Sequence, residues 1–320
     1  MIASKADVYL QDIPIDKIDR NPENPRLYFR QRELDELTDS IRRHGVQVPI
    51  AVYKERSKYI LIDGERRWRC SLKLNKKTIP ALIQEKPDAL TNLVLMFNIH
   101  ALREQWDLFT ISLKLPRVIE LFSIKQGYVP NERELSEETG LSRSVIRRCK
   151  ILMGLPPHHI DTIKAELQKP KSDQRLSEDF FIEMERSLIT VSRSMPEIIP
   201  DEVHRERIRQ TLLHKYQKGI IKNLVDLRKI ARMARASNVE ADIDKARTEL
   251  NRLFHEPNYS IDDAYRKSVS EAYIERDVKS HIESLIENLN SIEITELDET
   301  LIGLLKDLEG IVNGILRGRV

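Results

Sequence analysis

Hydrophobic positions follow a period of two in the first part of the chain and a period of about 3.6 after residue 88. In the first part, short alternating runs bounded by proline, glycine or charged residues predict strands. The first run has a proline stop, so it is predicted to lie at the edge of a sheet. The strands are predicted at 8–18, 48–54, 58–63 and 78–84.

Two helices are predicted among these strands. Residues 33–44 place Leu34, Leu37 and Ile41 on one helical face, and Gly45 follows as a C-cap. Residues 65–74 have the pattern of the second helix. Strands and helices mixed in this way predict an α+β fold for the N-terminal part of the chain.

From residue 89 onward the helical period persists, so we expect an all-helical remainder. Pro156 and Pro157 end its first stretch, and breaks are expected near Pro196 and Pro200. Helices are predicted at 89–97, 108–126, 132–139, 142–153, within 176–236, and around 261–289 and 297–316. The expected domains are 1–88, 89–175, 176–240 and 241–320.

The composition is that of a soluble globular protein, with 40% hydrophobic and 32% charged residues in a chain of 320. The sequence contains no apolar run near the roughly 20 residues that cross a bilayer, and its N-terminus lacks a secretory type of apolar segment. Cys70 and Cys149, the only cysteines, are far apart in the sequence, which excludes a disulfide framework and a cysteine-ligated zinc. We therefore expect a cytoplasmic protein without a membrane partner.

The net charge of +2 conceals an asymmetry between the two ends of the chain. The first 240 residues carry 43 basic and 34 acidic side chains (+9), whereas residues 241–320 carry 10 and 17 (−7). The basic part favours an anionic partner and the acidic part a protein contact. Ordinary solvated surfaces explain the same charges equally well.

The sharpest local feature is the sequence Asp-Gly-Glu-Arg-Arg-Trp-Arg at residues 63–69, where a predicted strand turns into a helix. A helix N-terminus presents unpaired backbone N–H groups that attract anions, and Gly64 lets the backbone approach a ligand. Arg66 and Arg67 add forked donors suited to phosphate oxygens. Taken alone, a solvated basic helix start with Trp68 packed in the core fits the same residues.

A second motif, at residues 135–149, has the pattern of a helix-turn-helix, with a small residue at Ser136 and a glycine turn at Gly140. Its second helix would present donors suited to base edges and phosphates, although a plain helical hairpin with a basic face is the alternative. Apolar residues for the contact between the helices are Leu135, Leu141, Ile146 and Cys149. The candidate DNA-binding residues are Ser142 (also the helix N-cap), Arg143, Ser144, Arg147 and Arg148.

Both motifs occur in an order that resembles the ParB-type partition proteins, whose N-terminal domain has the ParB/sulfiredoxin fold. The resemblance covers about residues 10–155, and the Gly-Glu-Arg-Arg box in this setting is specific. The matching segments are Asn21-Pro22 with Asn24-Pro25-Arg26, the run His-Gly-Val-Gln-Val-Pro-Ile at 44–50, the box at 63–69, and Ile79-Pro80-Ala81.

This resemblance implies that CTP binds between the N-terminal domain and the helices that follow. The loop containing Arg26 and the stretch containing Gly45 and Gln47 match the segments that hold the cytidine and ribose. The box that grips the triphosphate is matched by Gly64, Glu65, Arg66 and Arg67. The resemblance also implies DNA, a second copy of the chain and a partition ATPase as partners, and association with the nucleoid.

The chain departs from the family at the next box, which in the family reads Glu-Asn-x-Gln-Arg. Asn98 matches, but Phe97 replaces the acidic residue, His100 stands in the place of Gln, and Arg103 is displaced by two positions. Asn98 is left as a weak, neutral ligand for Mg²⁺. We therefore expect CTP binding with slow or absent hydrolysis.

Other features have simpler interpretations. Cys70 lies beyond the turn where sulfiredoxins carry their cysteine, so it is expected to be a small buried hydrophobe. His158 and His159 are expected in a loop or on the surface. Residues 202–235 hold ten Lys/Arg against three acidic residues and form either a phosphate-binding groove or a solvated helix pair. The stripe expected to be buried there is Ile208, Leu212, Ile220, Leu224 and Ile230.

The C-terminal helix has a seam of leucine and isoleucine at steps of four and three, typical of a coiled coil. Three glycines interrupt its helix, so the seam could pack within the chain as easily as dimerise. The seam residues are Leu297, Leu301, Leu304, Leu308, Ile311 and Ile315.

We expect a ParB-like DNA clamp that responds to CTP and acts in the partitioning of a chromosome, plasmid or mobile element. A transcriptional regulator or defence-system adaptor with the same DNA reader, and a ParB-like nuclease, are the alternatives. Asp63 and Glu65 are the only close acidic pair near the box, which gives the nuclease little support.

Overall fold

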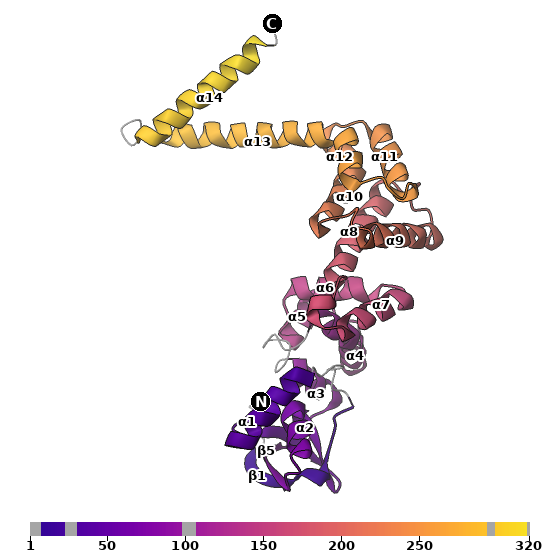
Figure 1. Ribbon diagram of the computed structural model, residues 1–320, viewed down its shortest axis with the longest axis vertical. Coiled ribbons are helices and arrows are strands. Elements are labelled where there is room, and N and C mark those ends of the chain that lie inside the picture. Colours follow the sequence, from indigo (N-terminus) through magenta and orange to yellow (C-terminus); the bar gives the residue numbers. More distant parts are fainter. Residues whose placement is uncertain (1–7, 23–30, 98–106, 293–297, 319–320) are drawn as a thin grey trace. The chain divides into compact units, whose positions relative to one another are not determined.

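The computed structural model describes residues 8–22, 31–97, 107–292 and 298–318. The chain divides into two compact units, Met1–Arg186 and Ser187–Val320 (Figure 1). The boundary between the units lies within a helix. The expected domain ends at residues 88, 175 and 240 remain predictions.

The first unit begins with a five-stranded mixed sheet. Its strands are β1 (Tyr9–Pro14), β2 (Ile18–Asp19), β3 (Ile50–Glu55), β4 (Lys58–Asp63) and β5 (Thr78–Gln84). In the order β1-β5-β3-β4-β2, β1 lies at the edge, as its proline stop predicted. The central strand β3 runs parallel to β5 and antiparallel to β4, so its backbone is paired along both edges.

Two helices, α1 (Gln31–His44) and α2 (Glu65–Lys73), pack against each other beside this sheet. Ile41 of α1 is buried, whereas Leu34 and Leu37 are partly buried. The helix ends at Gly45, whose φ of 73° is the left-handed conformation expected of a glycine C-cap. The sheet core is formed by Ile13, Ile50, Val52, Ile79 and Ala81, all fully buried.

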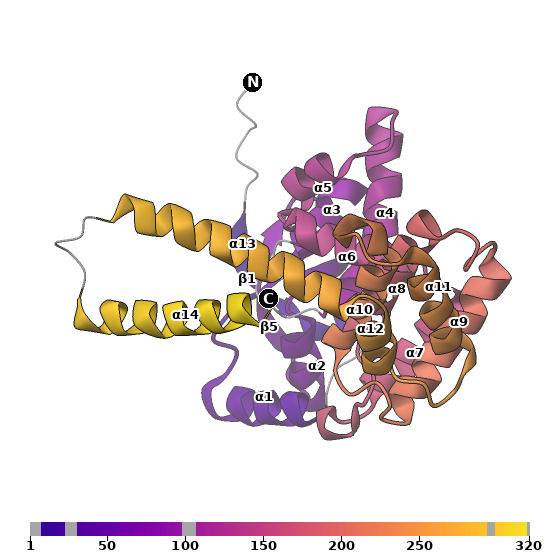
Figure 2. The same ribbon diagram turned by 90° about the horizontal axis from the view of Figure 1, so that it is seen from above.

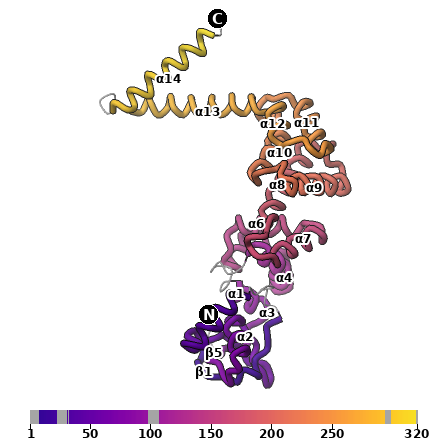
Figure 3. Tube along the Cα trace, in the orientation of Figure 1, coloured from indigo at the N-terminus to yellow at the C-terminus, as the bar shows by residue number. Residues whose placement is uncertain are grey.

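Helices follow the sheet, and the path from one to the next can be traced in Figure 3. They are α3 (Ala89–Met96), α4 (Leu108–Gln126), α5 (Glu132–Thr139), α6 (Arg143–Met153) and α7 (Pro157–Gln168), with α8 (Glu178–Ser194) crossing the boundary between the units. The α+β part followed by helices confirms the predicted fold class. Helix α7 was not predicted, because Pro157 is its first residue rather than a stop.

The prediction that His158 and His159 lie in a loop or on the surface is wrong for His159. Both residues are in α7, and His159 is buried. Its ring lies 5.5 Å from that of Phe181, centroid to centroid. The histidine is therefore part of an aromatic core contact.

The described residues of the second unit form helices joined by turns, with no strand among them. After α8 it contains α9 (Glu202–Gln217), α10 (Leu227–Ala234), α11 (Ile243–His255), α12 (Ile261–Ser268), α13 (Ser270–Ser291) and α14 (Glu299–Arg317). Helices α10, α11 and α12 contact one another and lie together in Figure 2. The predicted helix at 261–289 is divided at Val269, and α11 was not predicted.

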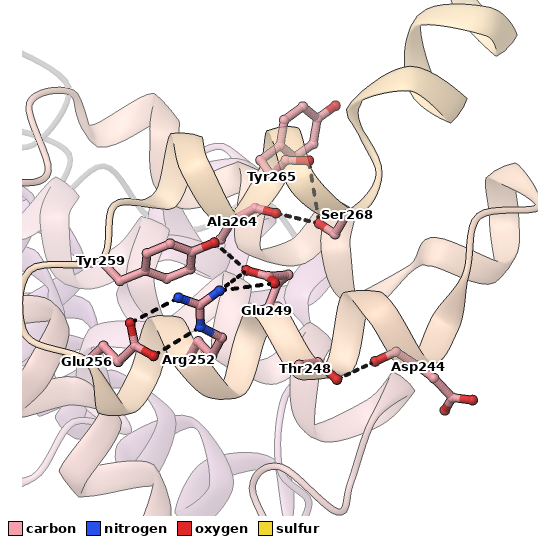
Figure 4. Close-up of polar contacts among 9 residues, drawn as sticks. All are labelled: Asp244, Thr248, Glu249, Arg252, Glu256, Tyr259, Ala264, Tyr265 and Ser268. Atoms are coloured by element: carbon pink, nitrogen blue, oxygen red, sulfur yellow. Dashed lines mark hydrogen bonds and ion pairs between the residues drawn. The ribbon is translucent and has the colours of Figure 1, made fainter.

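A polar network holds the loop that joins α11 to α12 (Figure 4). Arg252 donates to both Glu249 and Glu256, and the Tyr259 hydroxyl donates to Glu249. From α9, the buried Lys215 ammonium donates to the carbonyl oxygens of Glu256 and Tyr259 at 2.7 and 2.6 Å. Burial lowers the pKa of Lys215 to about 8.

Within the described ranges, no helix is both long enough and apolar enough to cross a membrane.

Candidate nucleotide and DNA sites

The turn between β4 and α2 is built around Gly64, which has a φ of 95°. A Cβ atom on Gly64 would lie 2.6 Å from Cγ2 of Ile50 on β3 and 3.2 Å from Cζ of Arg67. Both the positive φ and this close packing require glycine. No described side chain caps the N-terminus of α2, so the N–H groups of its first turn are suited to an anion.

The Arg67 side chain stabilises this turn by hydrogen bonds to two neighbouring segments. One guanidinium nitrogen, Nη1, donates to the carbonyl oxygens of Val48 and Pro49, which precede β3, at 2.6 and 2.5 Å. The other, Nη2, donates to Asp63 at 2.8 Å, and the side chain is only 19% exposed. In this structure Arg67 therefore joins the 48–49 segment to the strand-to-helix turn, although the sequence suggested that it would grip phosphate.

Arg66 is less completely engaged. Its Nη2 donates to the carbonyl oxygen of Glu33 at 3.3 Å and lies 3.5 Å from the Glu33 carboxylate. Its Nε is buried and has no hydrogen-bond partner among the described residues. The side chain is 32% exposed, so an anion at the start of α2 can reach it.

The Glu65 carboxylate is almost fully buried and belongs to an ion-pair cluster. Arg69 donates to it from Nη2 and Nε at 2.6 and 2.9 Å, and Arg20 Nε lies 3.4 Å away. Two guanidinium groups therefore compensate its charge. These contacts anchor the Glu65 carboxylate to α2, and its role in nucleotide binding stays a prediction.

The remaining nucleotide candidates lie near the same turn or outside the described residues. Gly45 has a φ of 73°, and the exposed Gln47 donates from Nε2 to the His44 carbonyl oxygen. Arg26 and Asn98 lie outside the described residues. Phe97, which replaces the acidic residue of the family box, is fully buried in the helical core with Leu93, Leu115 and Leu135.

The pair α5 and α6 forms the predicted helix-turn-helix. Gly140 sits between the helices with a φ of 74°, and the four predicted contact residues (Leu135, Leu141, Ile146 and Cys149) are buried. Asn131 and Glu134 form a capping box at the start of α5. The Ser142 hydroxyl accepts a hydrogen bond from the Val145 N–H at 3.3 Å, which confirms Ser142 as the N-cap of α6.

The outward face of α6 carries the remaining DNA candidates. Arg143 and Ser144 are exposed in the first turn. Arg147 is 61% exposed and donates to Glu132 at 2.8 Å, and Arg148 pairs with Asp179. Exposed ion pairs contribute little, so phosphate groups can replace these carboxylates at small cost.

Both cysteines are buried, as predicted. Cys70 donates weakly to the Leu34 carbonyl oxygen at 3.4 Å, and burial raises the pKa of Cys149 to about 12. A thiol in either place lacks the access that a reactive cysteine needs.

Residues 2–99 match the family model described as the ParB N-terminal domain. This chain carries a ParB N-terminal domain. In the structure, that domain comprises the five-stranded sheet with α1, α2 and α3.

Curated relatives match about half of this chain. The probable chromosome-partitioning protein ParB of Pseudomonas putida is 33% identical over 160 residues, which are 49% of this chain and 51% of that protein. The nucleoid occlusion protein of Bacillus pumilus is 30% identical over 172 residues, or 53% and 54% of the two chains. The chain thus spans about half the length of the curated relatives that it matches.

Among solved structures, the C-terminally truncated chromosome-partitioning protein ParB from Caulobacter crescentus complexed with CTP-gamma-S is 25% identical to this chain. The match covers 57% of this chain and 99% of that one, with a TM-score of 0.28. That score is too low to transfer the position of a ligand.

Sequence reasoning missed one contact that the ParB N-terminal domain makes with its last helix. The buried Asn21 side chain donates to Asn92 of α3 at 3.3 Å. Asn21 belongs to a segment that resembles the ParB-type family. That resemblance is the sequence feature from which a structural role of Asn21 could have been predicted. The amide pair anchors the start of the Asn21–Pro22 loop to α3.

The basic segment 202–235 is not a uniformly solvated surface. Arg209 is buried and pairs with Glu202 and Glu206, and Lys215 is fully buried. Of the apolar stripe predicted there, Ile208, Leu212 and Ile230 are buried, whereas Ile220 and Leu224 are only partly covered.

Proposed function

We propose that this protein is a CTP-responsive DNA-binding protein that acts in the partitioning of a chromosome, plasmid or mobile element. The observation that carries the proposal is the combination, in one compact unit, of a ParB N-terminal domain and a helix-turn-helix with an outward basic face. The name of the Pseudomonas putida relative, which matches 49% of the chain, supports a partition role.

The nucleotide part of the proposal rests on the strand-to-helix turn. A triphosphate at the N-terminus of α2 would accept hydrogen bonds from backbone N–H groups and from the partly exposed Arg66 guanidinium. Arg67 would keep the 48–49 segment beside it through the two carbonyl contacts. CTP is preferred as the nucleotide because the residues of the box and of the 44–50 run resemble those of the ParB-type family.

Equilibrium binding of CTP to the full chain, with and without candidate DNA, tests this proposal. We expect Arg66→Ala to remove most CTP binding, because it deletes the partly open guanidinium at the anion site. Arg42→Ala on α1, an exposed arginine paired with Asp39, is the matched control and should bind as the wild type does. Unchanged binding by Arg66→Ala would refute the placement of the triphosphate.

Hydrolysis is proposed to be weak. Phe97 supplies no oxygen and is fully buried, so Mg²⁺ would depend on Asn98 and the nucleotide itself. Slow turnover would favour a long-lived bound state, in which two N-terminal domains engage and close around DNA. Phosphate release measured beside CTP binding separates the two activities. Turnover as fast as nucleotide exchange would show that a carboxylate elsewhere holds the metal.

The clamp requires two copies of the chain, and α14 is proposed to join them. Leu304, Ile311 and Ile315 of the predicted seam are exposed, and Leu301 and Leu308 are only partly covered. Leu297 lies outside the described residues. A second copy would bury these apolar side chains. Deleting residues 291–320 should convert a dimer into a monomer in light scattering, and an unchanged mass would refute this role of α14.

A second candidate function is nucleoid occlusion or regulation without segregation. The Bacillus pumilus nucleoid occlusion protein, which matches 53% of this chain, favours it. Partition would require a partition ATPase as partner and association with the nucleoid. A measurable increase in the ATPase rate of a genomically adjacent partition ATPase, on addition of this protein, would support partition, and no increase would favour the second candidate.

A further inference from the structure

Helix α10 presents a line of arginines opposite its buried face. The buried face consists of Leu227, Ile230 and Met233, each fully buried. Two exposed arginines, Arg228 and Arg232, lie four residues apart on α10, and the exposed Arg235 follows as the residue that ends the helix. Because α10 contains no acidic residue, the charge on this face is not balanced within the helix.

A buried tyrosine fixes one of these arginines beside another from α13. The Tyr273 hydroxyl donates to the carbonyl oxygen of Arg232 at 3.1 Å. The guanidinium carbons of Arg232 and Arg276 lie 5.4 and 4.7 Å from the centre of its ring. Burial raises the pKa of Tyr273, so the ring stays neutral and keeps its role as a donor. One side chain therefore positions two cationic groups from two helices.

Asp277 is the acidic residue coupled to these arginines: it accepts hydrogen bonds from its neighbour Arg276, and this contact, with a smaller contribution from the charge of Arg232, lowers the pKa of Asp277. Arg232 also donates a long hydrogen bond, at 3.5 Å, to the hydroxyl of Tyr265. Among the described residues, neither Arg232 nor Arg235 forms an ion pair with a carboxylate.

Other cations of the same unit are satisfied by protein groups. Lys229 on α10 itself pairs with Asp226 and Asp262, and Arg247 pairs with Glu197 and Asp244. In the network of Figure 4, Arg252 lies between two glutamates. Arg232 is different, because its guanidinium group lies against the ring of Tyr273 and forms no ion pair with a carboxylate among the described residues.

We propose that Arg232, Arg235 and Arg276, here called the arginine face, form a second contact to the phosphate backbone of duplex DNA. This contact is independent of base sequence and separate from the helix-turn-helix. Planar guanidinium forks match phosphate oxygens, and duplex DNA offers about one negative charge per 1.7 Å of helix axis. The inference rests on the proposed function only in taking DNA as the partner.

The test measures binding of the full chain to a random-sequence duplex over a series of salt concentrations. The double variant Arg232→Ala with Arg235→Ala should bind at least about tenfold more weakly at low salt. Its plot of log affinity against log salt should lose about two units of slope, because two phosphate contacts are removed. The Tyr273 hydrogen bond should persist in this variant, since it goes to a backbone carbonyl oxygen.

Two companion variants separate charge from structure. Lys245→Ala with Arg266→Ala removes two exposed charges from α11 and α12 of the same unit and should leave the affinity and slope unchanged. Arg232→Lys with Arg235→Lys keeps the charge and should retain most of the affinity. If the lysine variant lost as much affinity as the alanine variant while both remained folded by circular dichroism, a phosphate contact through charge would be refuted.

The helix-turn-helix variant Arg143→Ala with Arg147→Ala keeps the two hypotheses distinguishable. It should lose preference for a specific site but keep the binding to random sequence that the arginine face provides. Unchanged affinity and slope in the α10 alanine variant would overturn the inference and leave the proposed function standing. Unchanged DNA binding, together with lost binding to phosphatidylglycerol vesicles, would assign the face to anionic lipid and also overturn it.

Discussion

The arginines at the start of α2 and those of α6 show two ways to present positive charge to an anion. In α2, Arg66 and Arg67 are 32% and 19% exposed and contact backbone carbonyl oxygens of distant segments. In α6, Arg147 is 61% exposed and contacts only a surface carboxylate among the described residues. The first arrangement is set by the fold before any ligand arrives, whereas the second can rearrange around one. A change to the backbone should therefore disturb the first site more than the second.

The largest effect is expected from Gly64→Ala. The new methyl group would meet Ile50 at 2.6 Å in a backbone conformation that disfavours side chains. We expect a loss of about 2–4 kcal/mol in the free energy of unfolding, from strain and overpacking together. Urea unfolding of the full chain, followed by circular dichroism, measures this loss.

Gly127→Ala is the matched control for that variant. Gly127 also has a positive φ, of 84°, but nothing lies within 4 Å of its added Cβ. Strain alone should cost about 1–2 kcal/mol there. Equal losses of stability in the two variants would mean that Ile50 moves aside. The start of α2 would then not be held more rigidly by the fold than α6 is.

A smaller effect, on affinity rather than stability, is expected from Arg147→Ala. Its binding to a specific DNA site should weaken by about 1–3 kcal/mol, the usual contribution of an arginine that reads a base. The free energy of unfolding should change by less than about 0.5 kcal/mol, because the side chain is exposed.

Gel-shift titration at fixed salt measures that affinity. Arg133→Ala on α5, where an equally exposed arginine pairs with Glu137, serves as the control and should leave binding unchanged. Wild-type affinity in the Arg147→Ala variant would discard α6 as the recognition helix.

The smallest effect concerns Cys149, which packs the inner face of α6. Burial raises the pKa of this thiol to about 12, above its value in the unfolded chain. The folded state then binds more protons than the unfolded state between about pH 9 and 12, so stability falls as the pH rises through that window. At pH 10 the loss should be about 1.5–2 kcal/mol.

Urea unfolding at pH 7 and pH 10 can isolate this contribution by comparison with Cys149→Ala. The alanine variant is less stable at both pH values but lacks the thiol, so its stability should decline less than that of the wild type. Parallel declines would show that the thiol reaches solvent and that α6 is more loosely packed than its buried face indicates.

The sequence predicted those parts of the fold that depend on neighbouring residues. The edge strand β1, the C-cap at Gly45 and the turn between α5 and α6 all follow from local patterns, and each is present. Helix α7 was missed because Pro157 was interpreted as a stop, although proline is also favoured in the first turn of a helix.

In the candidate sites too, features set by neighbouring residues could be predicted and contacts between distant residues could not. The positions of Gly64 and of the N-cap Ser142 could be predicted, since each depends on a motif a few residues long. The bracing role of Arg67 and the burial of Glu65 could not, because their partners Val48 and Arg20 are distant in the sequence. Only the folded chain brings these groups together.

The buried Phe97 has a consequence for how this protein can evolve. Its side chain is fully enclosed in the helical core. A direct change to glutamate would place an unpaired carboxylate among leucines, at a cost of several kcal/mol, which is a large share of the stability of a typical domain. Neighbouring core residues would have to change first. In evolutionary terms, an aromatic and an acidic residue at this position are separated by a fitness valley that single substitutions do not cross.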